Sequence, residues 1–136
     1  MATYVKFQPF VEHLAEKVHN LGSDTLTVAL TNTAPNATDA TLSQITEISY
    51  TNCSSRALTT SASSQTSGTY KLVISDLVLT ASGGSVGPFR YVVIYNDTAA
   101  SDQLIAYFDY GSSITLAAGE TFTLDFDATN GLLQIA

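Results

Sequence analysis

The chain begins with a hydrophobic pattern that has the period of an α-helix. From Phe7 to Leu21, apolar residues recur mostly at intervals of three or four, which places them in one stripe along a helix. Pro9 suits the first helical turn, and Gly22 ends the pattern. We therefore expect a helix over about residues 9–20 with one apolar face. This face either covers an open end of its own domain or docks on a neighbouring subunit.

Beyond Gly22 the pattern changes to the alternation of apolar and polar residues that is typical of half-buried strands. Turn-forming residues interrupt this alternation every eight to twelve positions. Strands are expected at 26–30, 46–50, 56–63, 70–74, 77–81, 90–95, 103–110, 113–117, 121–127 and 132–135. Eight to ten short strands after one helix favour an antiparallel β-sandwich or jelly roll. We expect residues 1–136 to form one such domain.

Two local features of the strand pattern make more specific predictions. The alternation slips by one residue between 70–74 and 77–81, which predicts a bulge or break at Ser75-Asp76. The strictest alternation in the chain lies at 121–127. Its apolar side chains are expected to face the core: Phe122, Leu124 and Phe126.

The charge of the chain is sparse and unevenly distributed. Only 12% of the residues are charged, whereas 34 of 136 are Ser or Thr, so small hydroxyls cover much of the surface. Residues 1–90 hold five bases and six acids, and residues 91–136 hold six acids and no base. This acidic half would repel a phosphate backbone, so we expect no nucleic-acid partner. The acidic half is either a solubilising surface or an electrostatic match to a more basic partner.

Signals for membranes, secretion and disulfides are weak. No apolar run approaches the ~18 residues of a membrane span, and the first residues lack the apolar segment of a signal peptide. We expect neither a membrane anchor nor secretion by the usual route. Cys53 is the single cysteine, which excludes an intramolecular disulfide and a cysteine-based zinc site. The two histidines lie in the N-terminal segment, so a catalytic thiol is not expected either.

Motifs for catalysis or metal binding are incomplete. Glu16-x-x-His19 has the spacing of half a di-iron site, but the second pair and two further helices are missing, so we interpret both residues as polar helix surface. Asp125-x-Asp127 resembles the start of a calcium loop, but the expected glycine comes one position late and Ala136 stands where the bidentate Glu belongs. Weak calcium binding at these two carboxylates stays open. A glycosidase pair among the acids of the last 46 residues is conceivable, but nothing singles out two of them. We predict no enzymatic activity, no cofactor and no metal.

Three stretches, residues 5–37, 69–97 and 108–135, resemble small virion proteins encoded in the head-gene region of tailed bacteriophages. The functional template is the capsid cement, or decoration, protein of Bordetella-type podophages, a small jelly roll that bridges capsomers. The resemblance implies a structural protein that is made in the host bacterial cytoplasm and binds the major capsid protein on the exterior of the virion capsid. It also implies self-association as a dimer or higher oligomer.

The candidate contact residues belong to the two surfaces that the motifs leave without a role, the helix stripe and the acidic half. They are Phe7, Phe10, Val11, Leu14, Asp97 and Asp102. Two alternative functions stay open: a phage tail, head–tail or fibre component, and a glycan-binding jelly-roll module. A tail or connector protein would occur at about 6–12 copies per virion, as expected of ring symmetry, rather than hundreds. A glycan-binding module would recognise sugars and need not co-purify with heads.

Overall fold

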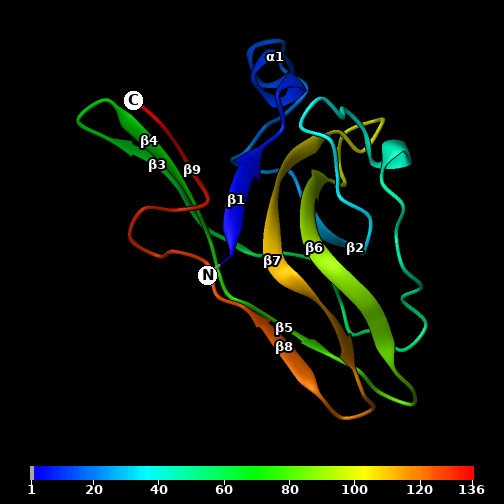
Figure 1. Cartoon of the computed structure of the whole chain (residues 1–136). Helices are drawn as coiled ribbons and strands as arrows, with labels where there is room; N and C mark the ends of the chain where they lie inside the picture. The colour runs from blue at the N-terminus through cyan, green and yellow to red at the C-terminus, as the bar shows by residue number, and fades with distance from the viewer. Residues whose placement is uncertain (1) are drawn as a thin grey trace.

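The computed structural model describes residues 2–136, and their fold is mainly β (Figure 1). The nine strands of this range are β1 Thr3–Lys6, β2 Leu26–Thr31, β3 Thr60–Thr66, β4 Thr69–Ile74, β5 Leu77–Thr80, β6 Val86–Asn96, β7 Leu104–Leu116, β8 Thr121–Leu124 and β9 Leu133–Ile135. The helices are α1 Pro9–Ala15 and the short 3-10 helix η1 Leu42–Gln44. Every strand pairing is antiparallel. The predicted antiparallel β-sandwich with one N-terminal α-helix is confirmed.

The strands form two layers. One layer is a four-stranded sheet in the order β1-β7-β6-β2, and the other consists of the sheets β3-β4-β9 and β5-β8. The second layer is divided because β4 ends at Ile74 and β5 begins at Leu77, which confirms the predicted break at Ser75-Asp76. The break keeps the apolar side chains of both strands in the core, since Leu72 and Leu79 are completely buried.

One hydrophobic core joins the two layers, with the inner face of the four-stranded sheet on one side and β4, β5, β8 and β9 on the other. The prediction for β8 and the residues after it is confirmed, because Leu124 and Phe126 are buried while Thr123 and Asp125 are exposed. Phe122 is half-buried and packs edge-on against Phe89, with 5.5 Å between ring centroids.

Strand β2 departs from the expected half-buried pattern because all six of its residues are buried. Its outer face lies under the segment that follows it, 32–50, which adds a second small core. The buried members of this second core are Phe7, Ala29, Ile45, Val93, Tyr95 and Leu104. The buried Thr31 hydroxyl is satisfied locally, since it donates to the Thr33 carbonyl over 3.2 Å. A strand with Thr at alternate positions therefore has no solvent-facing side in this fold.

The helix is shorter than the expected range 9–20, since α1 ends at Ala15. Lys17 takes up a left-handed conformation with φ 70°. Its N–H donates to the Leu14 carbonyl over 3.3 Å, and the Val18 N–H donates to the His13 carbonyl over 2.9 Å. These two bonds form the Schellman motif that closes many helices, here with Lys in place of the usual Gly. No helix within residues 2–136 is long and apolar enough to cross a membrane.

The expected strands 46–50 and 56–63 differ from the structure because both segments lie along the edge of β2. Residues 46–50 are not a strand, but the Ile48 N–H donates to the Leu30 carbonyl of β2 over 3.0 Å. Residues 56–58 are bonded to the same edge, and the ladder of β3 begins only at Thr60. The segment thus covers an edge strand instead of adding a regular one.

The expected strands 103–110 and 113–117 are one strand, β7. The turn signal between them is Gly111, which has φ 97° and lies within a shift of register between β6 and β7. The glycine therefore produces a bulge and not a reversal of the chain. β1 was not expected from the sequence, because four residues directly before the helix give too little alternation.

Candidate interaction surfaces

The apolar stripe of α1 packs largely within its own domain. Phe7 is completely buried and Phe10 is 2% exposed, so the expectation that these two residues form a contact surface is wrong for the isolated chain. Leu14 is half-buried against the main core, and Val11 is 51% exposed. The helix sits at one end of the sandwich, above β1 and β7 (Figure 1). Of the two alternatives for the stripe, the structure favours the covering of an open end.

The two acidic candidates lie on the outer side of the four-stranded sheet. Asp97 is exposed at the end of β6, where it accepts a hydrogen bond from the Thr27 hydroxyl over 3.4 Å. Asp102 is half-buried and lines, with Glu47, a shallow hollow of about 520 Å³. The buried Tyr95 lies among these groups. Burial raises its pKa, a hydrogen bond and the charge of Arg56 lower it, and the charges of Asp97 and Glu47 raise it.

Four carboxylates therefore surround the second core, and we call them the outer acidic surface. They are Asp39, Glu47, Asp97 and Asp102. Asp39 belongs to the group because its Oδ1 accepts a hydrogen bond from Gln44 Nε2 over 3.5 Å, next to Ile45 of the second core. Arg56 lies among these carboxylates, with its guanidinium 3.6 Å from the centre of the Tyr50 ring, whose hydroxyl donates to Glu47 over 2.7 Å.

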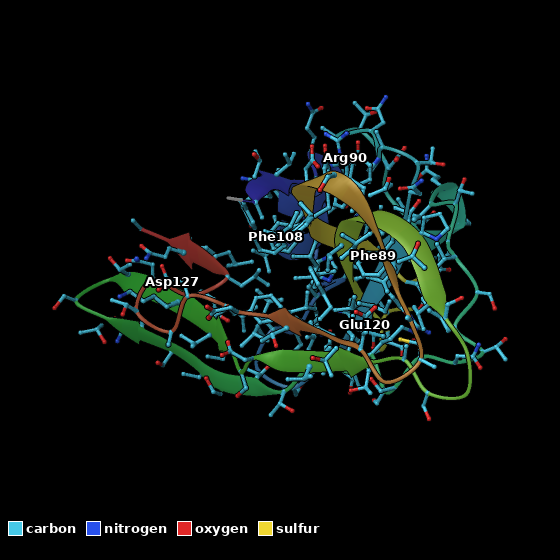
Figure 2. The ribbon with its side chains drawn as sticks, turned by 60° about the horizontal axis from the view of Figure 1, so that its bottom comes forward. Phe89, Arg90, Phe108, Glu120 and Asp127 are labelled. Carbon is cyan, nitrogen blue, oxygen red and sulfur yellow. The ribbon has the colours of Figure 1, made fainter. Side chains whose placement is uncertain are left out.

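The other acids of residues 91–136 do not join this surface. Asp109 forms an ion pair with Arg90 over 2.8 Å, and this contact lowers the pKa of the carboxyl. Glu120 and Asp127 are exposed at separate places on the molecule (Figure 2). The uneven charge of the sequence is thus partly neutralised by a base from residues 1–90 and is spread over several faces.

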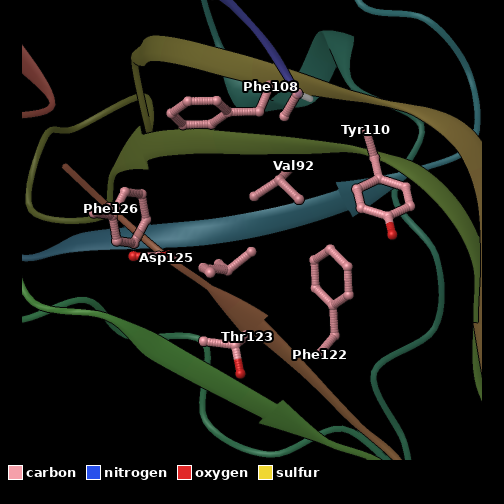
Figure 3. Close-up of a pocket in the computed structure, with 9 residues that line it drawn as sticks. Val92, Phe108, Tyr110, Phe122, Thr123, Asp125 and Phe126 are labelled. Atoms are coloured by element: carbon pink, nitrogen blue, oxygen red, sulfur yellow. The ribbon is translucent and has the colours of Figure 1, made fainter.

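An aromatic cleft of about 340 Å³ opens between β7 and β8 (Figure 3). We define the aromatic cleft by its lining residues: Ala2, Val92, Phe108, Tyr110, Phe122, Thr123, Leu124, Asp125 and Phe126. The rings meet edge-on across it, with centroids 5.3 Å apart for Tyr110 and Phe122 and 6.2 Å for Phe108 and Phe126. Among these nine residues Asp125 alone carries a carboxylate. The cleft is therefore suited to burying an apolar side chain.

The aromatic cleft could not be predicted from the sequence, because it forms where β7 and β8 diverge beside the short edge strand β1. Only the alternation of Phe122, Leu124 and Phe126 gave a signal, and it indicated a closed core. The partial exposure of Tyr110, 45%, shows that the core is open to solvent at this side.

A polar cluster joins the end of the helical region to the end of β6. Asn96 is completely buried, and its Oδ1 accepts hydrogen bonds from the N–H groups of Thr98 and Ala99 over 3.0 and 3.1 Å. Its Nδ2 must then face the other way, where it lies 2.6 Å from Asp24 Oδ2 and 3.0 Å from His19 Nδ1. Because the amide nitrogen can only donate, His19 Nδ1 is an acceptor and the proton resides on Nε2.

The interpretation of His19 as polar helix surface is wrong, since this residue is only 5% exposed. Burial, with a smaller contribution from His13, lowers its pKa to about 4. Glu16 lies exposed at the end of α1 and takes no part in this cluster. No group of three or more His, Cys, Asp or Glu side chains within residues 2–136 is arranged to hold a metal ion. His19 instead links the helical region to β6.

The two acids of the calcium-like sequence have separate roles. Asp127 Oδ1 accepts hydrogen bonds from the N–H groups of Thr129 and Asn130, both over 2.8 Å, and these bonds lower the pKa of the carboxyl. This carboxylate closes the turn before β9, whereas Asp125 lies at the aromatic cleft. Cys53 is half-buried, and burial raises the pKa of its thiol, which disfavours the nucleophilic thiolate.

Comparison of this chain with models of known protein families, with curated proteins and with solved structures finds no match in any of the three. The two surfaces that stand out are the outer acidic surface and the aromatic cleft.

Proposed function

We propose that this chain is a structural protein of a tailed-phage virion, a cement or decoration protein that binds the outer surface of the capsid and stabilises the head. The major capsid protein is the proposed partner. We propose this partner because residues 5–37, 69–97 and 108–135 resemble small head-region proteins of tailed phages. The observation that carries the proposed contact is the outer acidic surface, which gathers four carboxylates on one side of a rigid β-sandwich.

The outer acidic surface is suited to binding because two of its four carboxylates are held in place before any contact is made. Asp39 accepts a hydrogen bond from the Asn36 N–H over 2.9 Å, and Asp97 accepts one from the Thr27 hydroxyl. The second core lies directly beneath and fixes the backbone. Groups that are already ordered lose little conformational entropy on binding. A basic partner surface would then be attracted and oriented by these charges.

A cement protein catalyses no reaction and acts only through stable contacts with neighbouring capsomers. About 800 Å² per partner is the usual scale of one stable protein contact, and repetition around a shell multiplies its effect. The low content of Lys and Arg, five residues in 136, also leaves few sites for trypsin-like proteases on an exposed coat.

The proposal is tested by rebinding purified protein to heads from which it has been removed. The double variant Asp97→Asn/Asp102→Asn removes two charges from the outer acidic surface and preserves side-chain size. We expect its affinity for stripped heads to fall about tenfold or more, equivalent to at least ~1.4 kcal/mol, and the binding of the unchanged protein to weaken with salt.

The matched control is Glu16→Gln/Glu120→Gln, which removes the same charge at exposed positions outside the outer acidic surface and the aromatic cleft. This variant should rebind with nearly unchanged affinity. Equal losses in both double variants would contradict a contact through the outer acidic surface. Failure of the unchanged protein to bind heads or to raise their resistance to heat would contradict the cement function itself.

The alternative functions make different demands on the molecule. A tail, head–tail or fibre component would bind a different part of the virion and occur in few copies. A glycan-binding module would need several polar groups that bond sugar hydroxyls beside an aromatic ring. The aromatic cleft has four rings but only three residues with polar side chains, Tyr110, Thr123 and Asp125. Its lining therefore favours an apolar protein segment over a sugar.

A further inference from the structure

Strand β1 leaves one edge of the four-stranded sheet open. Within residues 2–136, β1 pairs with β7 alone. The Phe7 N–H continues this ladder by donating to the Ile105 carbonyl over 3.1 Å. In an antiparallel pair, alternate residues bond to the neighbouring strand, so Thr3 and Val5 face β7 in the same way. The N–H and C=O groups of Tyr4 and Lys6 therefore point away from the sheet.

The opposite edge of the same sheet is covered. The Val28 N–H of β2 donates to the Arg56 carbonyl over 3.0 Å, and the Leu58 N–H donates to the Leu26 carbonyl over 2.9 Å. Proteins usually cover or block an edge strand, because its free backbone groups are a template for another strand. The open edge at β1 is thus the place where this sheet can accept one more strand.

The open edge runs beside the mouth of the aromatic cleft. The ring of Tyr4 packs edge-on against Phe108, with 5.3 Å between centroids, and Phe108 and Ala2 line the cleft. Tyr4 is 39% exposed and Tyr110 is 45% exposed. Backbone groups without partners and exposed aromatic side chains therefore occur together at one side of the molecule.

The charges at this edge favour a second copy of the chain as the occupant. Lys6 is the only charged residue among the first eleven, in a chain whose net charge is −7. Tyr4 and Lys6 project to the same face of the sheet, as alternate residues of a strand do. Asp125 lies at the cleft on that face. A two-fold axis perpendicular to the sheet would bring Lys6 of each copy toward the Tyr4 ring and the Asp125 carboxylate of the other.

We propose that β1 pairs in antiparallel orientation with β1 of a second copy, so that the two four-stranded sheets become one continuous sheet. The outward-pointing groups set the register: Tyr4 of one copy exchanges both backbone hydrogen bonds with Lys6 of the other. Each Lys6 ammonium then contacts a Tyr4 ring, a favourable cation–π arrangement. Four-residue strands form a small contact, well under the ~1,200–2,000 Å² of a standard interface, so the dimer dissociates on dilution.

The test is sedimentation velocity of the purified chain over a hundredfold range of concentration. The unchanged protein should pass from monomer to dimer. Lys6→Pro removes an outward N–H and leaves the bonds to β7 intact, a substitution that edge strands tolerate. It should weaken the dimer at least tenfold. Val11→Lys, which alters an exposed apolar residue on α1 outside the β1 edge, is the control and should leave the dimer unchanged.

The register is tested by exchanging charges. Tyr4→Lys places two ammonium groups opposite each other and should weaken the dimer at least tenfold, and Tyr4→Lys/Lys6→Glu should restore it. Circular dichroism and thermal melting establish that each variant is folded. A chain that stays monomeric at every concentration would overturn the proposal, as would a dimer that is lost with Val11→Lys but kept with Lys6→Pro. Because the experiment contains no capsid, its outcome is independent of the cement function.

Discussion

His19 Nδ1 lies 3.0 Å from Asn96 Nδ2, across 77 positions of sequence. This bond joins the segment after α1 to the last residue of β6 and fixes His19 as the neutral tautomer with its proton on Nε2. A doubly protonated ring would turn a donor toward the Asn96 amide, which is itself a donor. The folded state therefore disfavours charged His19, both by burial and by the orientation of its neighbour.

The stability of the protein should consequently depend on pH between about 6.5 and 4. The pKa of His19 is lowered from 6.5 to about 4 in the folded chain, so the unfolded chain binds more protons in this range. The stabilisation that neutral His19 gives is fully present above about pH 6.5 and is lost as the pH falls toward about 4. We expect a loss of roughly 3 kcal/mol, at 1.36 kcal/mol per pKa unit, measured by urea unfolding at a series of pH values.

The control for this pH dependence is His19→Asn, which keeps an acceptor for the Asn96 amide but does not titrate. Its stability should be nearly constant over the same range, even if it is lower throughout. Asp109 and Asp127 have lowered pKa values. Their contributions to the stability of the fold are therefore lost only as the pH falls below the usual ~3.9 of an aspartate. An equal slope in the variant and in the unchanged protein would contradict the assignment to His19.

The turn before β9 should not tolerate a side chain at Gly131. Gly131 has φ 79°, and a Cβ added there would lie 2.6 Å from the Leu72 carbonyl oxygen, which accepts the N–H of Leu132. Gly119 has φ 89° with nothing within 4 Å of an added Cβ. Gly119→Ala should cost about 1 kcal/mol for the left-handed backbone, and Gly131→Ala at least ~2 kcal/mol more, since the β9 contact must shift. Equal melting temperatures for the two variants would contradict this account.

The two phenylalanines at β8 should differ in their contribution to stability. Phe126 is 7% exposed in the main core, so Phe126→Ala should cost ~3–5 kcal/mol. Phe122 is half-buried and lines the aromatic cleft, so Phe122→Ala should cost less, because part of its surface is already in water. Val78→Ala, at a residue that is 50% exposed, is the reference for a surface change and should stay within ~1 kcal/mol. Chemical denaturation gives all three values, and the reverse order for the two phenylalanines would show that β8 is turned the other way.

The sequence predicted the features that depend on neighbours along the chain. Alternation was enough to place Phe122, Leu124 and Phe126 on one face, because a strand has a fixed period. The slip of that alternation located the break at Ser75-Asp76. These features need no knowledge of what packs against the strand.

Features that depend on distant residues were missed. The burial of Thr27 and Thr31 arises because another segment covers β2, and nothing local distinguishes such a strand from a half-exposed one. The helix ends at Ala15 and is closed by the left-handed Lys17, where the pattern indicated Gly22, since apolar spacing continues through the turn. His19 was placed on the surface for the same reason.

For the candidate contact residues, too, the sequence showed what depends on chain neighbours and missed what depends on distant residues. An apolar stripe has the same sequence whether it packs on its own sheet or on a partner, so Phe7 and Phe10 could not be told apart from interface residues. Asp97 and Asp102 are accessible acids, as expected, but the carboxylates around them come from a distant part of the chain. The aromatic cleft and the open edge of β1 exist only once the strands are arranged in space.

The most direct test of the cement function is the number of copies of this chain in purified virions, measured by quantitative mass spectrometry against the major capsid protein. The account predicts hundreds of copies per particle, in a fixed ratio to the capsid subunits and retained on heads that lack tails. A count of about 6–12, the number expected of a ring-shaped tail or connector assembly, or the absence of the chain from the particles, would contradict it.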